Sequence, residues 1–248
     1  MRDFEDSTLW RISAFERARD AGQVGPAAGM GRPTLLPTTL LADLHRLQGD
    51  PSADDVLEVM AACMRHREAA LLYLAHGSYV WPVTLFPSQL LYHSPRDVSD
   101  IAAETALSKL ALISAEPPGV RPPGHAMHER VAADDKYRPL AALLWAVALH
   151  GPRDMLLTEI GGRAAYRLAS GRANDLPAAL GALMPAALRL RQESASLREM
   201  GTWPGLSIQR ASRLLNALYL TGALIVTRSH PAARREPTNW RNLLGRRR

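Results

Sequence analysis

The chain has 248 residues, of which 47% are apolar and 22% charged, with 30 basic against 24 acidic side chains. This ordinary globular composition suffices for one large domain or two small ones, and no run approaches the about 18 apolar residues of a membrane-spanning helix. Acidic residues interrupt the N-terminal sequence, which therefore does not resemble a secretory signal. A single cysteine, Cys63, excludes an internal disulfide and a thiolate-rich metal site, and it indicates a reducing, cytoplasmic location.

The net charge of +6 is concentrated at the C-terminus. Residues 228–248 hold seven arginines against one acidic residue, Glu236, so positions 1–227 are balanced at 23 basic and 23 acidic side chains. Such a basic tail either binds phosphates, because arginines release counterions from a polyanion, or only keeps the protein soluble. The sequence leaves both interpretations open. The arginines of the basic tail are Arg228, Arg234, Arg235, Arg241, Arg246, Arg247 and Arg248.

Two stretches are typical of linkers. Residues 21–33 consist largely of Gly, Ala and Pro without apolar periodicity, and residues 116–124 contain four prolines, which favour an extended connector. The sequence therefore predicts five segments. They are an N-terminal arm with a flexible linker (1–37), a small α+β domain (38–116), a Pro-rich linker (117–124), a helical domain (125–230) and a basic tail (231–248).

The α+β domain is predicted to contain helices and a small antiparallel sheet. Helices are expected over 40–48 and over 52–68, the second capped by Ser52. Short aliphatic and aromatic runs at 69–75, 79–86 and 88–94 predict strands. Because Pro82 and Pro87 lack an amide hydrogen, we expect the middle strand to lie at an edge or to be broken. Asp97 is then expected to cap a helix over 98–115.

The following domain is predicted to be helical, so that the whole fold is α+β and mainly helical. The segment 137–150 is apolar nearly all round, which indicates a buried helix. Further helices are expected over 152–170 and over 175–195, the latter kinked or split at Pro185. One core is expected to contain an apolar residue from each element: Trp145, Leu149, Leu190, Leu197, Ile208, Leu215, Leu218 and Leu224.

Residues 194–229 contain the most distinctive pattern. Ser194 or Ser196 caps a short helix, a Gly-containing turn follows, and Ser207 caps a second helix that ends at Gly222, before an apolar strand. This order resembles the helix-turn-helix and wing of bacterial winged-helix modules. The sequence after Arg228 offers no return strand, so the wing is expected to be truncated.

The order of a sheet-containing unit, a helical region and this terminal module is also loosely similar to PATAN-type regulatory domains of bacterial signalling proteins. That resemblance implies binding of partners and not catalysis. No residue motif anchors it, so it assigns no site residues.

The helix over 207–222 supports two interpretations. A DNA reader would present donors to base edges, and five polar residues could form such a face: Gln209, Arg210, Ser212, Arg213 and Asn216. The leucine-rich second half of the helix instead favours packing against protein on two sides. Protein docking is the preferred interpretation, and DNA binding through this helix and the basic tail is the alternative.

No pattern indicates catalysis, a cofactor or a metal. The phosphate-loop, dinucleotide-binding and nucleophile-elbow motifs are absent. His125, His128 and Glu129 match no zinc motif, and Cys63 lies on the apolar stripe of a helix, as an inert thiol would. The sequence therefore predicts a cytoplasmic, non-enzymatic bacterial regulatory or adaptor protein that binds protein partners, and a winged-helix DNA-binding regulator with a basic C-terminal arm as the alternative. No membrane partner is expected.

Overall fold

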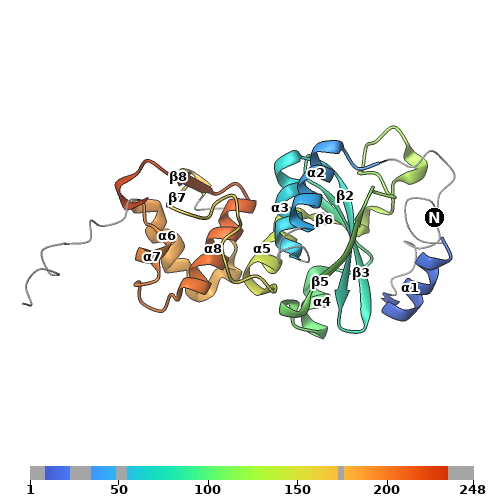
Figure 1. Ribbon diagram of the computed structural model, residues 1–248, viewed down its shortest axis with the longest axis horizontal. Coiled ribbons are helices and arrows are strands. Elements are labelled where there is room, and N and C mark those ends of the chain that lie inside the picture. Colours follow the sequence, from blue (N-terminus) through green and yellow to red (C-terminus); the bar gives the residue numbers. More distant parts are fainter. Residues whose placement is uncertain (1–8, 23–34, 49–54, 173–175, 234–248) are drawn as a thin grey trace, which may run out of the picture. The chain divides into compact units, whose positions relative to one another are not determined.

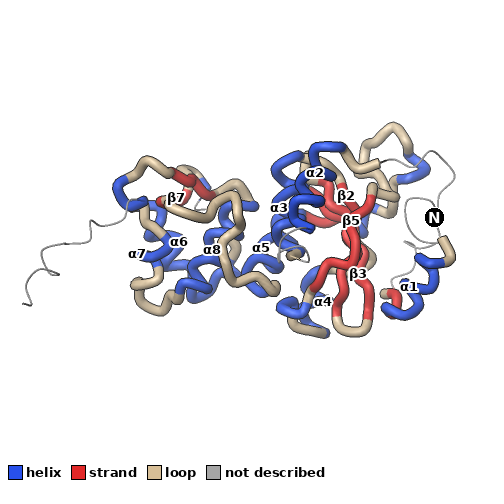
Figure 2. The backbone as a smooth tube through the Cα atoms, viewed as in Figure 1, coloured by secondary structure: helices blue, strands red, loops and turns tan. Residues whose placement is uncertain are grey.

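The chain forms two compact units, unit 1 (residues 1–153) and unit 2 (154–248), shown in Figure 1. The computed structural model describes residues 9–22, 35–48, 55–172 and 176–233. Both units combine helices with antiparallel strands, so the fold is α+β (Figure 2). The Pro-rich segment 117–124 does not separate them. Strands on both sides of it belong to one sheet of unit 1, and the observed boundary follows Arg153.

Unit 1 is built on one antiparallel sheet. Its strand order is β5-β2-β3-β4-β6, and the two-residue β1 pairs with the start of β3. The three strands expected from the apolar runs are confirmed as β2, β3 and β4. The bounds are β1 Trp10–Arg11, β2 Ala70–His76, β3 Tyr79–Phe86, β4 Leu91–His93, β5 Ala111–Glu116 and β6 Tyr137–Pro139.

The central strand β3 tolerates Pro82 without a break, contrary to the expectation. In an antiparallel ladder, hydrogen-bonded and non-hydrogen-bonded pairs alternate. The alternation starts at the hydrogen-bonded His76–Tyr79 pair that closes the β2–β3 hairpin, so the Tyr73–Pro82 pair is a non-hydrogen-bonded one. The backbone nitrogen of Pro82 therefore faces away from β2. On that other edge, β1 pairs with Tyr79 and Val80, and β4 pairs with 84–86. Among the described residues, no strand pairs with 81–83 there, so no hydrogen bond requires the missing amide hydrogen.

The predicted helix over 98–115 is wrong beyond its first turns. Asp97 caps α4 (Val98–Glu104) as expected, its carboxylate accepting the N–H of Ser99 at 2.8 Å. The chain then forms β5, which pairs with β2. A bulge interrupts that ladder, because Tyr73 lies opposite Ser114 but Leu74 opposite Leu112. Pairing with a strand far away in the sequence overrides the local helical pattern here.

Helices cover both faces of the sheet (Figure 1). On one face, Phe15 of α1 (Ile12–Asp20) packs in a cluster with Leu71, Tyr73 and Val80, and its ring centroid lies 4.7 Å from that of Tyr73. The other face carries α3 (Val56–His66) and α5 (Leu140–His150), and α2 (Thr38–Gln48) packs against α3. The sheet core is therefore closed on two sides.

The N-cap of α3 is Asp55 and not Ser52. Its carboxylate accepts the N–H groups of Leu57, at 2.9 Å, and Glu58, at 3.3 Å, and it also pairs with the Arg153 guanidinium. A second ion pair, 2.8 Å long, joins Arg153 to Glu58. Arg153 is buried, so the last residue of unit 1 is fixed to the start of α3.

The described part of unit 2 contains the α-helices α6, α7 and α8 and a two-stranded antiparallel sheet, β7–β8. The predicted helix over 152–170 is wrong, because β7 forms there and pairs with β8. The chain from 175 to 195 is split as expected, but at Gly181 (φ 46°); Pro185 lies in the first turn of α6. The bounds are β7 Ala165–Leu168, α6 Met184–Gln192, α7 Leu197–Met200, α8 Ile208–Leu220 and β8 Leu224–Thr227.

The helix, turn, helix and strand expected over 196–227 are present. Ser196 and Glu199 form a capping box at α7, Ser207 caps α8 by accepting the N–H of Arg210 at 3.2 Å, and Gly222 has a φ of +70° after α8. Strand β8 pairs with β7, which precedes the helices in the chain. Among the described residues after β8, which end at 233, no return strand follows.

The expected single core is divided between the units. Leu190, Leu215 and Leu218 are buried in unit 2, whereas Trp145 and Leu149 belong to unit 1. Leu197 and Leu224 are half-buried. Ile208 is 51% exposed, because the first turn of α8 projects beyond the core.

Leu218→Ala should destabilise unit 2 by about 2–5 kcal/mol, because the side chain is fully buried and its removal leaves a cavity. Leu188→Ala is the matched control, since this α6 leucine is 42% exposed. Denaturant unfolding of both variants measures the difference. Equal losses in the two variants would show that Leu218 is not a core residue.

Candidate functional site

The predicted DNA-binding face of α8 is only partly on the surface. Gln209 and Arg210 are exposed, and Arg213 is half-buried. Ser212 is 1% exposed and Asn216 is 0% exposed, so their inclusion in that face was wrong. The helical spacing was correct, but a neighbouring segment covers this side of the helix.

That segment is the loop of residues 155–160, which the Asn216 side chain holds against α8. The amide oxygen of Asn216 accepts the N–H of Leu157 at 2.9 Å, and its amide nitrogen donates to the carbonyl of Met155 at 2.9 Å. One turn further along α8, the Tyr219 hydroxyl donates to the Glu159 carboxylate at 2.7 Å. The second half of α8 is therefore an internal helix of unit 2.

Two of the predicted binding arginines bond to the protein's own backbone. Arg210 donates to the carbonyl of Gly205 at 2.7 Å. Arg228 donates to the carbonyls of Gly161, at 2.9 Å, and Glu159, at 3.0 Å, so it fixes β8 to the loop before β7. The other basic-tail arginines lie outside the described residues: Arg234, Arg235, Arg241, Arg246, Arg247 and Arg248.

Asn216→Ala should destabilise unit 2 by about 1–3 kcal/mol, because it leaves the N–H of Leu157 and the carbonyl of Met155 without their partner. Hydrogen exchange at the Leu157 amide should accelerate together with this loss. The control is Gln209→Ala on the exposed first turn, expected to change stability by less than about 0.5 kcal/mol. Unchanged exchange at Leu157 would contradict the bridging role of Asn216.

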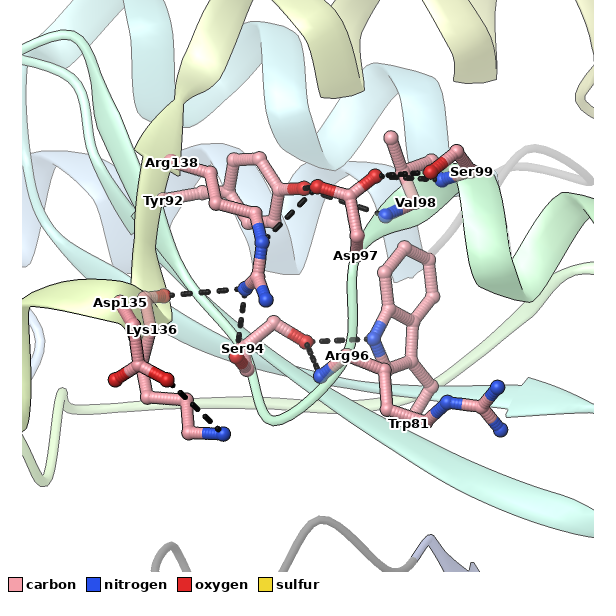
Figure 3. A network of polar contacts seen from close by, with 10 residues as sticks. All are labelled: Trp81, Tyr92, Ser94, Arg96, Asp97, Val98, Ser99, Asp135, Lys136 and Arg138. Atoms are coloured by element: carbon pink, nitrogen blue, oxygen red, sulfur yellow. Dashed lines mark hydrogen bonds and ion pairs between the residues drawn. The ribbon is translucent and has the colours of Figure 1, made fainter.

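A network of polar contacts lies in unit 1, where β4, β6 and the start of α4 meet (Figure 3). Arg138 of β6 pairs with the Asp97 carboxylate at 3.0 Å and donates to the carbonyl of Ser94 at 3.0 Å. The Tyr92 hydroxyl donates to Asp97 at 3.3 Å, and the Trp81 indole N–H donates to the Ser94 hydroxyl at 2.7 Å. The side chains of Arg138, Tyr92 and Asp97 point toward one another, and the Trp81 ring points toward Ser94 (Figure 3).

The pKa shifts in this network agree with a structural role. Burial raises the pKa of Tyr92 to about 12, so its hydroxyl remains a proton donor. Asp97, whose pKa is lowered below its usual value, accepts hydrogen bonds from Ser99 and Tyr92 as an ionised carboxylate. Each of these groups is engaged in holding α4 and β6 to the sheet.

His93, at the end of β4, is a buried titratable group beside this network, 1% exposed. Burial, together with the nearby charges of Arg138 and Lys136, lowers its pKa to about 4. The ring lies 5.2 Å, centroid to centroid, from that of Tyr137. At neutral pH the side chain is therefore an uncharged part of the packing.

This shift predicts a loss of stability in acid. Between pH 6.5 and about 4, the unfolded chain binds a proton at His93 that the folded protein does not bind. The free energy of unfolding therefore decreases as the pH is lowered through this range, by up to about 3 kcal/mol. Denaturant melts across this range should show that His93→Gln removes this part of the slope. The exposed His128→Gln should leave it unchanged, and equal slopes for all three proteins would contradict the assignment.

Metal-binding and thiol chemistry have little support in the described residues. No group of three His, Cys, Asp or Glu side chains there is placed to hold a metal ion. His125 accepts the N–H of Met127 at 3.1 Å through Nδ1. Cys63 is buried as expected, and burial raises the pKa of its thiol to about 12.

Among the described residues, no helix has the length and apolar character needed to cross a membrane.

The turn after β3 contains an exposed leucine in a strained backbone conformation. Leu90 has a φ of +56°, and its side chain is 62% exposed. Its backbone is fixed, since its carbonyl accepts the N–H of Leu140 at 2.8 Å. The left-handed region costs a non-glycine residue about 1–2 kcal/mol. Sequence reasoning missed Leu90, because it resembles the apolar residues of the neighbouring strands.

A second left-handed residue lies beside this turn. Arg67, the exposed C-cap of α3, has a φ of 55°, and its carbonyl accepts the Ser88 hydroxyl at 3.0 Å. These two are the non-glycine residues with positive φ in the described chain. The Ser88 hydrogen bond therefore joins the turn that contains Leu90 to the backbone of Arg67.

The units differ in charge. Unit 2 carries 15 basic against 6 acidic residues, and unit 1 carries 15 against 18. Both lysines, Lys109 and Lys136, belong to unit 1, so the 15 basic residues of unit 2 are all arginines. The excess positive charge thus belongs to unit 2 as a whole, including its basic tail.

Comparison with known proteins finds no match to the chain among family models, curated proteins or solved structures.

Proposed function

We propose that this chain is a cytoplasmic, non-enzymatic bacterial regulatory or adaptor protein that works by binding a protein partner. The observation that carries the proposal is Leu90. Glycine or asparagine would adopt its φ at lower cost, and a side chain that is mostly in solvent adds little to the fold. Contact with an apolar pocket on a partner would account for both the backbone strain and the exposure of Leu90, since strained residues cluster at functional sites.

Arg67 extends this contact with charge. It is exposed, and the Ser88–Arg67 hydrogen bond fixes its backbone beside the turn. The partner that fits this surface has an apolar pocket for Leu90 and a carboxylate near Arg67. The polar network around Asp97 supports a non-enzymatic role, because its groups are engaged with one another and with the backbone.

The alternative, a winged-helix regulator that reads DNA through α8, has weaker support. The elements of such a module are present, but residues 155–157 bond to Asn216 on the side of the helix that would face the bases. A recognition helix presents several side chains to base edges in the major groove. Here the exposed residues are those of the first turn, where Arg210 already donates to Gly205.

The proposal is tested by comparing partners captured by the wild-type protein and by Leu90→Asn. The partners are captured from a lysate of the encoding organism that has been treated with nuclease, so that proteins held only through nucleic acid are not captured. We expect Leu90→Asn to lose one or more protein partners. Its stability should change by no more than about 1 kcal/mol, because relief of backbone strain offsets the lost burial. Leu35→Asn is the matched control, since Leu35 is 76% exposed elsewhere on unit 1.

Two outcomes would contradict the proposal. One is identical capture by wild type and Leu90→Asn. The other is selection of a specific duplex sequence from a random pool, with that preference lost in Arg213→Ala, which would support the DNA-reading alternative.

A further inference from the structure

We propose that unit 2 binds the phosphate backbone of duplex nucleic acid, without reading its bases, through an arginine surface formed by Arg167, Arg191 and Arg198. These residues lie on β7, α6 and α7, and none belongs to the α8 face or to the basic tail. The inference rests on the geometry and charge of unit 2, so it is independent of the protein contact proposed for Leu90.

The backbone brings the three arginines together. Tyr166 of β7 and Ala195 exchange both of their N–H to carbonyl hydrogen bonds, at 2.8 and 3.0 Å. Arg167 follows Tyr166, and its guanidinium reaches the carbonyl of Arg191 at 3.5 Å. Arg191 and Arg198 lie four residues before and three residues after Ala195, so their Cα atoms are within about 14 Å and 11 Å of it.

The three arginine side chains lie at the surface, with one nitrogen of Arg167 directed to the backbone carbonyl of Arg191. Arg167, Arg191 and Arg198 are exposed, and no carboxylate of the described residues forms an ion pair with them. The nearby carboxylates have other partners. Glu193 pairs with Arg189, and Glu199 completes the capping box with Ser196. The surface is therefore positively charged and not neutralised from within.

Arginine suits phosphate, because its planar guanidinium donates two parallel hydrogen bonds to phosphate oxygens. Single-stranded nucleic acid is a weaker fit, since such sites stack bases on exposed aromatic rings. In the described part of unit 2, Tyr166 and Trp203 are buried, Tyr219 is half-buried, and Arg189 covers the Trp203 ring at 4.4 Å. A lipid surface is also a weaker fit, because interfacial binding uses one amphipathic helix and these arginines lie on three elements.

The test is binding of two fluorescent duplexes of unrelated sequence to the full chain, measured by anisotropy at several salt concentrations. The test variant is Arg167→Gln/Arg191→Gln/Arg198→Gln. It should bind both duplexes about 10- to 100-fold more weakly near 0.1 M salt, and its slope of log K against log salt should be shallower by about 2–3. Its melting temperature should match that of the wild type.

The control removes the same charge from unit 1, as Arg11→Gln/Arg17→Gln/Arg19→Gln, at three exposed positions. It should retain the affinity and salt slope of the wild type. A chain lacking residues 234–248 should still lose affinity when the test substitutions are added, because the arginine surface is separate from the basic tail.

Several outcomes would overturn the inference. Equal losses in test and control variants would show that net charge alone matters. A change in relative affinity for the two duplexes would show base reading. Tighter binding of the wild type to anionic vesicles than to duplex, lost in the test variant, would assign the surface to lipid. If the wild-type protein bound no duplex at low salt, the proposed binding of duplex phosphates would be contradicted.

Discussion

The Asn216 amide is a polar group in the middle of the most apolar part of α8, and unit 2 depends on the way in which it is satisfied. A buried amide without partners would cost the fold more than its hydrogen bonds contribute. It is bonded instead to the backbone of residues 155 and 157, which are thereby fixed along the helix. This one requirement makes α8 a central support.

The two units use charge differently. In unit 1, charged groups join one element to another, as Arg138 joins β6 to the cap of α4 and Arg153 joins the end of the unit to α3. In unit 2, 6 acidic residues stand against 15 arginines, and Arg167, Arg191 and Arg198 are exposed without a carboxylate partner among the described residues. Unit 2 thus has an excess of positive charge that unit 1 lacks, which is why we place the proposed phosphate contact on unit 2.

Local chemistry made part of this fold predictable. The caps Asp97, Ser196 and Ser207 depend on a side chain and an amide a few residues apart, and they were recognised from the sequence. Strands β5 and β7 were mistaken for helix, because each is stabilised by a partner strand distant in the sequence. The predicted DNA-binding face of α8 was partly wrong for a related reason. The helical spacing of its residues was correct, but Asn216 is covered by a loop that lies about sixty residues earlier in the chain. Leu90 could not be recognised from the sequence, since the feature that distinguishes it is its positive φ.

The bulge in β5 has a consequence for strand pairing at the edge of the sheet. This strand lies at one end of the sheet order, where backbone groups could add a strand from another molecule and begin aggregation. The extra residue at Ile113 disturbs the regular spacing that such an addition requires, and Pro117 and Pro118 follow directly with no amide hydrogen to offer. The bulge and the two prolines therefore disfavour the addition of a further strand along this part of β5.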